Sequence, residues 1–487
     1  MLFNSINFAI FLPIVFVLYW FVAKNNFRLQ NILLLIASYF FYACWDWRFL
    51  FLLVFSTLLD YFTGIKINKA INLVEKKFWF WLSISINLGF LGVFKYYNFF
   101  ASSFAEGLSI LGLNVNIWTL QIILPVGISF YTFHGLSYVI DIYKNRIEPE
   151  KNFIDYSLFV SFFPLLVAGP IERATHLLPQ IIKKREFNYV QAVDGLRQII
   201  WGLFKKIVIA DNCAEYANII FNNHTNYSGS TLALGAVFFT IQIYGDFSGY
   251  SDIALGTSRL FGINLIRNFA FPYFSRDIAE FWRRWHISLS SWFRDYLYVP
   301  LGGSQGGTIL KVRNTFIIFL VSGFWHGANW TFIVWGLLNA LYIMPSIIFN
   351  TNRNNLEIVA KGKLLPTIKE LLLMSTTFSL TTLAWIFFRA TDLSHAFSYI
   401  QRLVTGLVHR SYYIETMNFL YYNTKPAIPF LIIIFFLIEW LGRERQYAIE
   451  HLGLLKLKSI RWIFYYALIA AICYFSGKEQ EFIYFQF

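Results

Sequence analysis

The sequence is poor in charge. Only 14% of its 487 residues are Asp, Glu, Lys or Arg, whereas 57% are hydrophobic. Soluble domains usually contain about 25% charged and about 45–50% apolar residues. A water-soluble fold of this length cannot bury so many apolar side chains, but lipid is an adequate solvent for them. The composition therefore excludes a soluble protein and predicts an integral membrane protein whose first partner is the lipid bilayer.

Cysteines and familiar catalytic signatures are scarce as well. The three cysteines, Cys44, Cys213 and Cys473, have no CxxC spacing, so they define neither a metal site nor a disulfide framework. The sequence contains no HExxH, GxSxG or Rossmann fingerprint, which leaves a serine hydrolase or a metal-dependent hydrolase without support. We therefore expect no metal and no permanently bound cofactor.

Lys and Arg are missing from two connecting stretches, 99–117 and 212–230. Elsewhere the basic residues form short clusters between apolar segments, such as Lys183-Lys184-Arg185. This pattern is typical of cytoplasmic membrane loops, so the net charge of +13 does not indicate nucleic acid as a partner. The positive-inside rule predicts that the N-terminus and the C-terminal tail face outward, and that the basic loop 443–461 faces the cytoplasm.

A helix that crosses a bilayer needs about 20 apolar residues. The candidate segments are 7–23, 30–46, 48–64, 78–98, 118–140, 196–211, 231–262, 314–348, 370–388, 426–441 and 462–476. Because a long apolar stretch can fold into more than one helix, we expect about ten to twelve crossings. Phe8–Phe21 lacks a basic region before it and a cleavage site after it, which indicates a retained span rather than a signal peptide. With no internal repeat, the prediction is one all-α polytopic membrane domain over residues 1–487.

Two stretches predict membrane-associated segments that do not cross. The apolar run Tyr156–Ala168 is short and contains Pro164, which favours a re-entrant segment. Within 263–313, large apolar side chains recur at alternating spacings of three and four, which predicts one face of a helix lying in the membrane interface. These side chains are Trp282, Trp285, Leu289, Trp292 and Tyr296, with Arg283, Arg284 and Arg294 available to lipid headgroups.

Polar residues interrupt the apolar pattern at 242–252. Each carboxylate inside a membrane costs roughly 2.5–3.5 kcal/mol on insertion scales, so Asp246 and Asp252 need a partner or water. Ser248 and Asp252 are one helical turn apart and share a face. Two interpretations fit equally: a polar clamp between helices, or the lining of a functional cavity.

Two histidines stand in the other interrupted stretches. His286 follows Phe281-Trp-Arg-Arg-Trp, which a plain interfacial anchor explains, although the anchor does not explain the imidazole. His326 lies in the apolar stretch 314–348, directly between Trp325 and Gly327. Histidine suits proton transfer near neutral pH, and an ionisable residue inside a membrane is a functional hypothesis by default. The alternative for either histidine is a structural hydrogen bond.

Six stretches carry a resemblance to a known family. They read LPVGISFYTFHGLSYVIDIY at 124–143, FFPLLVAGPIER at 162–173, YGDFSGYSDIALG at 244–256, FWRRWHISLSSWFRDYLYVPLGG at 281–303, SGFWHGANWTFIVWG at 322–336 and FIYFQF at 482–487. Together and in this order they resemble the membrane-bound O-acyltransferase family, in particular its alginate O-acetyltransferase-like branch. The core motifs cover about 120–345, and neither His326 nor His286 departs from the family's pattern.

The resemblance implies a helical fold around a central tunnel, with His326 at the family's catalytic position and His286 at its second polar position. We expect His326 to act as a general base and His286 to orient or polarise the donor. We expect five further side chains to line the tunnel: Asp246, Ser248, Asp252, Trp325 and Asn329.

The resemblance also implies the substrates. A cytoplasmic thioester, acetyl-CoA in this branch, donates the acyl group, and a periplasmic acetyltransferase partner completes the transfer outside the bacterial inner membrane. The acceptor stays open between alginate, another exopolysaccharide and peptidoglycan. D-alanyl transfer of the teichoic-acid type is the alternative enzyme, and a transporter or lipid flippase is the alternative from another class.

Overall fold

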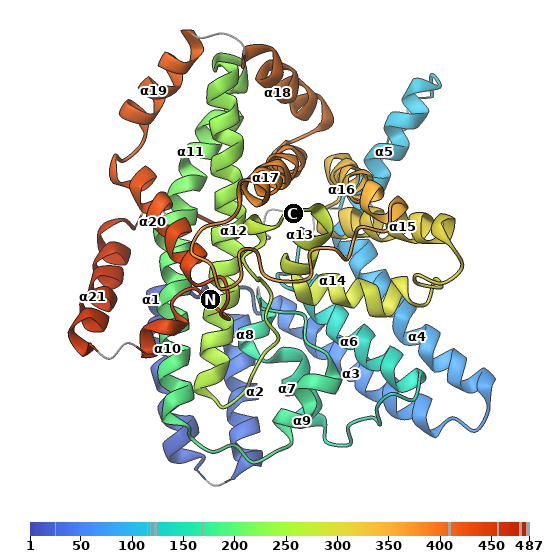
Figure 1. Cartoon of the computed structure of the whole chain (residues 1–487). Coiled ribbons are helices and arrows are strands. Elements are labelled where there is room, and N and C mark those ends of the chain that lie inside the picture. The colour runs from blue at the N-terminus through green and yellow to red at the C-terminus, as the bar shows by residue number, and fades with distance from the viewer. Residues whose placement is uncertain are drawn as a thin grey trace. The chain divides into compact units, whose positions relative to one another are not determined.

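The computed structural model describes residues 1–24, 26–113, 115–116, 118–120, 124–167, 169–407, 411–454, 457–476 and 480–483. Within these residues every regular element is helical, which confirms the predicted all-α class (Figure 1). The chain divides into two compact units, one formed by 1–192 with 257–266 and the other by 193–256 with 267–487. Each unit is described by itself below.

The first unit contains the N-terminal helices. They are α1 (Ile6–Val17), α2 (Phe27–Ala43), α3 (Arg48–Lys69), α4 (Leu73–Leu91), α5 (Tyr97–Ile110), α6 (Ile128–Tyr143), α7 (Phe153–Ser161), α8 (Phe163–Leu166) and α9 (Ala174–Ile181). α7 and α8 are separated by a break at Phe162, and every residue from Asp155 to Leu166 is buried. This broken, buried backbone agrees with a segment that does not cross; Ala168 at its end lies outside the described residues.

The second unit contains both predicted catalytic histidines. Its helices are α10 (Tyr189–Leu203), α11 (Asp211–Asn222), α12 (Gly229–Leu260), α13 (Ile278–Arg284), α14 (Ile287–Phe293), α15 (Thr308–His326), α16 (Trp330–Ile348), α17 (Ile368–Arg389), α18 (Leu393–Gly406), α19 (Ser411–Asn423), α20 (Ala427–Leu441) and α21 (Lys458–Tyr474). A π-helical segment, Phe204–Ala210, joins α10 to α11, and a second one, Arg294–Tyr298, follows α14.

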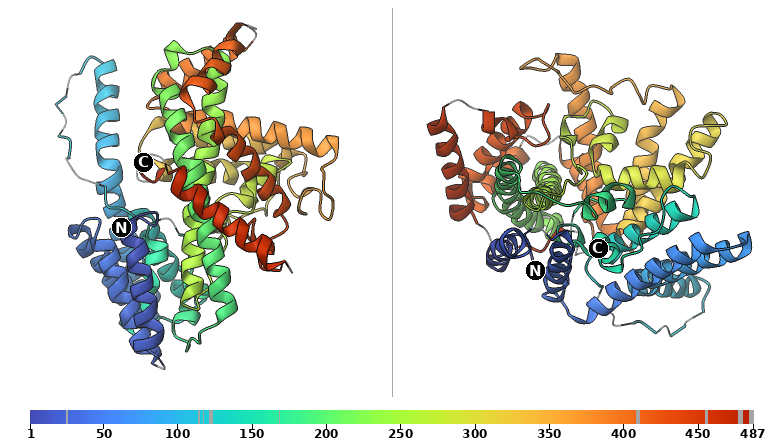
Figure 2. Two further views of the ribbon diagram at one scale, coloured as in Figure 1. Left: turned by 90° about the vertical axis from the view of Figure 1, so that its left-hand side faces the viewer. Right: turned by 90° about the horizontal axis from the view of Figure 1, so that it is seen from below.

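Glycines let α10 approach α12 closely. A Cβ added to Gly202 would lie 2.6 Å from the carbonyl oxygen of Gly249, and one added to Gly249 would lie 2.8 Å from the carbonyl oxygen of Gly202. Only the absence of both side chains permits this contact. Figure 2 shows the two green helices of this region side by side in both views. The approach brings Lys205 and Lys206, which follow α10, against the polar stretch of α12.

Six of the described helices are long and apolar enough to cross a membrane, or seven if one bent pair is a single span. The six are Arg48–Lys69, Leu73–Ile110, Gly229–Leu260, Thr308–His326, Trp330–Ile348 and Ile368–Arg389, and the bent pair is Tyr413–Asn423 with Ala427–Leu441. The chain is therefore a multi-pass membrane protein. The described helices do not reach the ten to twelve crossings expected, partly because the first two apolar segments, Ile6–Val22 and Phe27–Ala43, form shorter helices.

The two longest apolar stretches fold differently. The stretch 314–348 folds as two helices, α15 and α16, as a length beyond one crossing suggests. The stretch 231–262 instead forms one helix, α12, of 32 residues. Most of α12 is buried inside the protein, so its polar residues contact protein rather than lipid.

The interfacial helix predicted within 263–313 is wrong in two respects. The backbone breaks between α13 and α14, because His286 adopts a left-handed conformation with φ 43°. The predicted lipid-facing side chains Trp285 and Leu289 are buried, as are Trp292 and Tyr296. Helical spacing identifies an apolar face but does not distinguish a face that packs on protein from one that packs on lipid.

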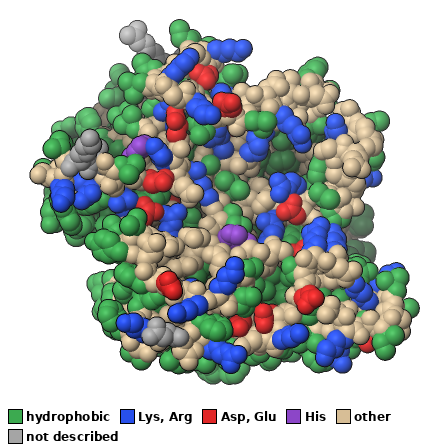
Figure 3. Space-filling view, turned by 60° about the horizontal axis from the view of Figure 1, so that its bottom comes forward, with side chains coloured by type: hydrophobic (Ala, Val, Ile, Leu, Met, Phe, Trp, Pro, Cys, Tyr) green, Lys and Arg blue, Asp and Glu red, His purple; other side chains and the backbone are tan. Residues whose placement is uncertain are grey.

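The arginines of this stretch are also mostly occupied within the protein. Arg284 donates to Glu280 Oε1 at 2.8 Å, and Arg283 donates to the backbone oxygens of Asn352 and Asn355. Arg294 is exposed beside Asp295. Figure 3 shows that Lys and Arg outnumber Asp and Glu on the face that it presents, in keeping with the net positive charge.

Candidate active site

His326 is the last residue of α15 and lies in an aromatic enclosure. Its ring centroid is 4.9 Å from that of Trp325, 5.0 Å from that of Trp335 on α16, and 5.3 Å from that of Phe388 on α17. The side chain is buried, with 4% of the residue exposed. Three elements therefore fix the orientation of the imidazole, and apolar rings keep bulk water from it.

The α15–α16 hairpin sets the position of His326 through a close helix crossing. A Cβ on Gly323 would lie 2.3 Å from the carbonyl oxygen of Phe332, and a Cβ on Gly336 would lie 2.3 Å from that of Phe319. Close approach through small residues is the usual way in which membrane helices pack. The two helices are thus held in van der Waals contact three residues before His326.

Asn329 ends the turn that follows His326. Its Oδ1 accepts a hydrogen bond from the backbone of Thr331 at 3.0 Å, which caps the first turn of α16. Its Nδ2 donates to the backbone oxygen of Thr391 at 2.8 Å. Asn329 therefore ties the α15–α16 hairpin to Thr391, which follows α17. This geometry gives it a supporting role, and its prediction as a tunnel-lining residue stays a prediction.

His286 lies at the break between α13 and α14 and is 1% exposed. Its ring meets Phe247 of α12 edge to face at 4.7 Å and lies 6.2 Å from Trp325. Its Nδ1 is 3.0 Å from Asn268 Oδ1. Burial lowers the pKa of His286 to about 3, because the charged ring loses its hydration. The ring is therefore neutral at physiological pH.

Trp325 connects the two histidines. Its indole is within 6.2 Å of the His286 ring and within 4.9 Å of the His326 ring. The structure thus brings together three of the residues predicted from the sequence, although 40 positions separate the two histidines along the chain. No sequence pattern required this proximity.

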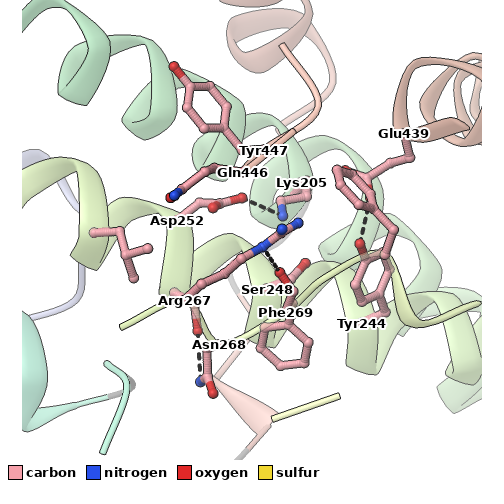
Figure 4. A pocket seen from close by; sticks show the side chains of 13 residues that line it. Lys205, Tyr244, Ser248, Asp252, Arg267, Asn268, Phe269, Glu439, Gln446 and Tyr447 are labelled. Atoms are coloured by element: carbon pink, nitrogen blue, oxygen red, sulfur yellow. Dashed lines mark hydrogen bonds and ion pairs between the residues drawn. The ribbon is translucent and has the colours of Figure 1, made fainter. Parts of the chain in front are cut away.

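Asp252 and Ser248 line a small cavity beside α12, together with Lys205, Arg267 and Glu439 (Figure 4). The cavity offers about 20 Å³, which is room for about one water molecule. Asp252 pairs with Lys205 at 2.5 Å and accepts from Gln198 at 2.7 Å. Asp252 is therefore held by a lysine, as a clamp would be, and also faces a small cavity. Its role as a tunnel-lining residue stays a prediction.

Asp246 belongs to a separate buried cluster. Lys206 lies 2.7 Å from both Asp246 and Asp211, and the backbone of Ile483 donates to Asp246 at 2.8 Å. All three charged side chains are nearly inaccessible. This arrangement is that of a clamp, which joins α12 to the start of α11 and to the C-terminal segment. Asp246 does not line the cavity that Asp252 faces.

Several residues that contact the predicted site residues in the structure were not predicted from the sequence. Lys205 and Lys206 pair with the two carboxylates, and Asn268 contacts His286. The importance of the two lysines could have been predicted, because two adjacent cations inside the apolar segment 196–211 require partners. Asn268 had no such signal, since a lone Asn in a loop is common. Among the described residues, no group of His, Cys, Asp and Glu has the geometry to hold a metal ion.

Comparison with known proteins extends the resemblance. The model of the membrane-bound O-acyltransferase family matches residues 149–387, which include both histidines and the polar stretch of α12. The chain is 39% identical over 398 residues to a probable alginate O-acetylase of Pseudomonas aeruginosa, covering 81% of this chain and 73% of the relative. It is 38% identical over 434 residues to a peptidoglycan O-acetyltransferase of Helicobacter pylori, covering 83% and 80%.

A third relative represents the other predicted enzyme. The chain is 31% identical over 229 residues to a teichoic acid D-alanyltransferase of Streptococcus thermophilus, covering 44% of this chain and 55% of the relative. The similarity is thus lower and shorter than that to the two O-acetyl-transferring relatives.

Proposed function

Because the chain belongs to the membrane-bound O-acyltransferase family and is an O-acyltransferase, we propose that it transfers an acetyl group from acetyl-CoA in the cytoplasm towards an acceptor at the cell surface. The single observation that carries the proposal is the pair of buried imidazoles, His286 and His326, which flank one indole in the region matched by the family. The extent of similarity to O-acetyl-transferring relatives favours acetyl over D-alanyl as the group transferred.

In the proposed reaction, His326 acts as general base. Its neutral ring takes the proton from an acceptor hydroxyl as the hydroxyl oxygen attacks the carbonyl carbon of the thioester. A C–O bond forms, the C–S bond breaks, and the thiolate leaves and takes up the proton from the imidazolium. A positioned general base contributes typically 10²–10⁴-fold to such a step. The aromatic enclosure supports this role, because exclusion of water limits hydrolysis of the thioester.

We assign the protein to the cytoplasmic (inner) membrane of a bacterium, with a periplasmic acetyltransferase as partner for the final transfer. The relatives from which this assignment is drawn act on alginate and on peptidoglycan, polymers that lie outside that membrane. The donor is a cytoplasmic thioester, so the acyl group itself has to cross. A tunnel past His326 would supply the route.

Single-turnover acetyl transfer by purified protein tests the catalytic assignment, with the affinity for acetyl-CoA measured separately. His326→Ala should bind acetyl-CoA nearly as wild type and lose about two or more orders of magnitude in transfer, because the proton moves only on the way to the transition state. His451→Ala is the matched control, since this exposed histidine contacts Arg445. Near-wild-type transfer by His326→Ala would overturn the assignment, and transfer of D-alanyl in place of acetyl would overturn the proposed donor.

A further inference from the structure

We infer that Asn268 is a positioning residue that holds His286 in the tautomer whose Nε2 accepts hydrogen bonds. In this tautomer His286 binds a hydroxyl or N–H group of a substrate and does not polarise the thioester carbonyl. The inference rests on the proposed function, in which His286 and the general base His326 flank the indole of Trp325. It changes the role expected from the sequence, which allowed His286 to polarise the donor.

The orientation of the Asn268 amide follows from its neighbours. Ser288 presents two groups to the amide atom that faces His286: its backbone N–H at 3.4 Å and its hydroxyl at 3.0 Å. A backbone N–H only donates, so the atom that it faces is the amide oxygen. On its other side the amide nitrogen donates to Ser251 of α12 at 3.3 Å. The amide is therefore fixed with Oδ1 towards His286.

The tautomer of His286 follows from that oxygen. Because Asn268 Oδ1 only accepts, the His286 Nδ1 that lies 3.0 Å away carries a hydrogen and donates it. A neutral imidazole carries one hydrogen, and burial keeps this ring neutral by lowering its pKa to about 3. Nε2 therefore keeps its lone pair. The hydrogen bond that one ring nitrogen makes decides what the other can do, as in histidines that bind metals.

The backbone around Asn268 makes this arrangement rigid. The chain before α13 pairs with the chain at its end: Ile287 donates to the backbone oxygen of Asn268, and Ala270 donates to that of Arg284, both at 2.9 Å. Asn268 is 1% exposed. His286 itself holds a left-handed conformation, which residues other than glycine adopt rarely and which persists where the surrounding structure enforces it. These backbone hydrogen bonds thus hold the Asn268 amide beside the His286 imidazole.

Because Nε2 accepts hydrogen bonds, the substrate group that it binds has to be a hydrogen-bond donor. A thioester carbonyl offers only lone pairs, so it cannot hydrogen-bond to this nitrogen. An acceptor hydroxyl can donate to it, and so can an amide N–H of the donor's pantetheine arm. His286 is therefore suited to orient a hydrogen-bond donor next to the base His326.

Two substitutions at Asn268 separate positioning from packing. Asn268→Ala removes the oxygen and should lower kcat by about 10- to 100-fold, the range seen when a group that orients a metal-binding histidine is lost. If Nε2 binds the acceptor hydroxyl, the KM for acetyl-CoA should stay within about twofold; if it binds the pantetheine N–H, that KM should rise as well. Asn268→Asp keeps an oxygen acceptor at the same place and should restore most of the lost rate. Asn87→Ala, which removes another buried asparagine with hydrogen bonds to Asp60 and Ser56, should lower the melting temperature and leave kcat unchanged.

A double-mutant cycle with His286→Ala separates the outcomes. If Asn268 acts through His286, Asn268→Ala costs no further rate in the His286→Ala background. An equal loss in both backgrounds overturns the positioning role and leaves the proposed function intact. Full activity of His286→Ala contradicts the role given to His286 itself. If Asn268→Ala does not fold, ¹⁵N NMR of histidine-labelled wild-type protein decides: the inference predicts a protonated Nδ1 on His286, and a protonated Nε2 would overturn it.

Discussion

Replacing Gly336 with alanine tests whether the α15–α16 crossing decides where His326 lies. The added Cβ would stand 2.3 Å from the carbonyl oxygen of Phe319 and 3.1 Å from its carbonyl carbon. Both of these are backbone atoms of a helix, which cannot rotate away as a side chain can. The two helices therefore have to separate by about 1 Å, as overpacked elements do when no neighbour can yield.

The expected effect on stability is modest and the effect on activity is large. Overpacking costs about 1–3 kcal/mol, and the better helix propensity of alanine returns at most about 1 kcal/mol. A displacement of about 1 Å in a catalytic group, however, can lower the rate about 10²-fold. We therefore expect Gly336→Ala to fold, to melt slightly earlier and to lose most of its acetyl transfer.

Single-turnover transfer and melting in detergent measure the two effects. Gly323→Ala should behave like Gly336→Ala, because its Cβ meets the carbonyl oxygen of Phe332 at the same 2.3 Å. Gly89→Ala is the matched control: this glycine is also helical, but its Cβ would meet nothing within 4 Å. Wild-type transfer by both crossing variants would refute the idea that this contact positions His326.

Three other predictions concern charge and topology. Lys206→Met should lower the free energy of unfolding by about 3–5 kcal/mol, because it leaves the carboxylates of Asp246 and Asp211 buried without their cation. Asp246→Asn should lower it less, since Lys206 keeps Asp211 as a partner. An unchanged melting temperature in Lys206→Met would contradict the clamp. His286 has a folded pKa of about 3 against about 6.5 in an unfolded chain, so its contribution to stability is complete above pH 6.5 and declines as the pH falls towards 3. The slope is about 1.4 kcal/mol per pH unit, and His286→Gln should flatten the melting profile over that range; an identical slope would show that other groups cause it. Single cysteines introduced into 443–461 should react with a membrane-impermeant reagent only after the cells are opened, and labelling in intact cells would overturn the predicted orientation.

The amino-acid sequence determined the kind of protein and the order of its motifs. Its high apolar fraction required lipid as solvent, and backbone groups in lipid are satisfied within single helices, which makes the all-α class predictable. The isolated polar residues, His326 and the α12 carboxylates, stood out because an ionisable group in an apolar segment is expensive and therefore rare. These properties belong to short stretches of chain, so they can be read without knowing the fold.

Only the tertiary structure decided which partner each polar group has. Asp252 meets Lys205, Asn268 meets His286, and His326 meets Phe388 across separations that no local pattern encodes. Periodicity failed for α13 and α14 for the same reason, since an apolar face has the same spacing whether protein or lipid covers it. Packing settles these questions because close contacts, such as the glycine crossings of α10 with α12 and of α15 with α16, depend on both surfaces at once. A chain specifies such contacts only through the folded arrangement of all its helices.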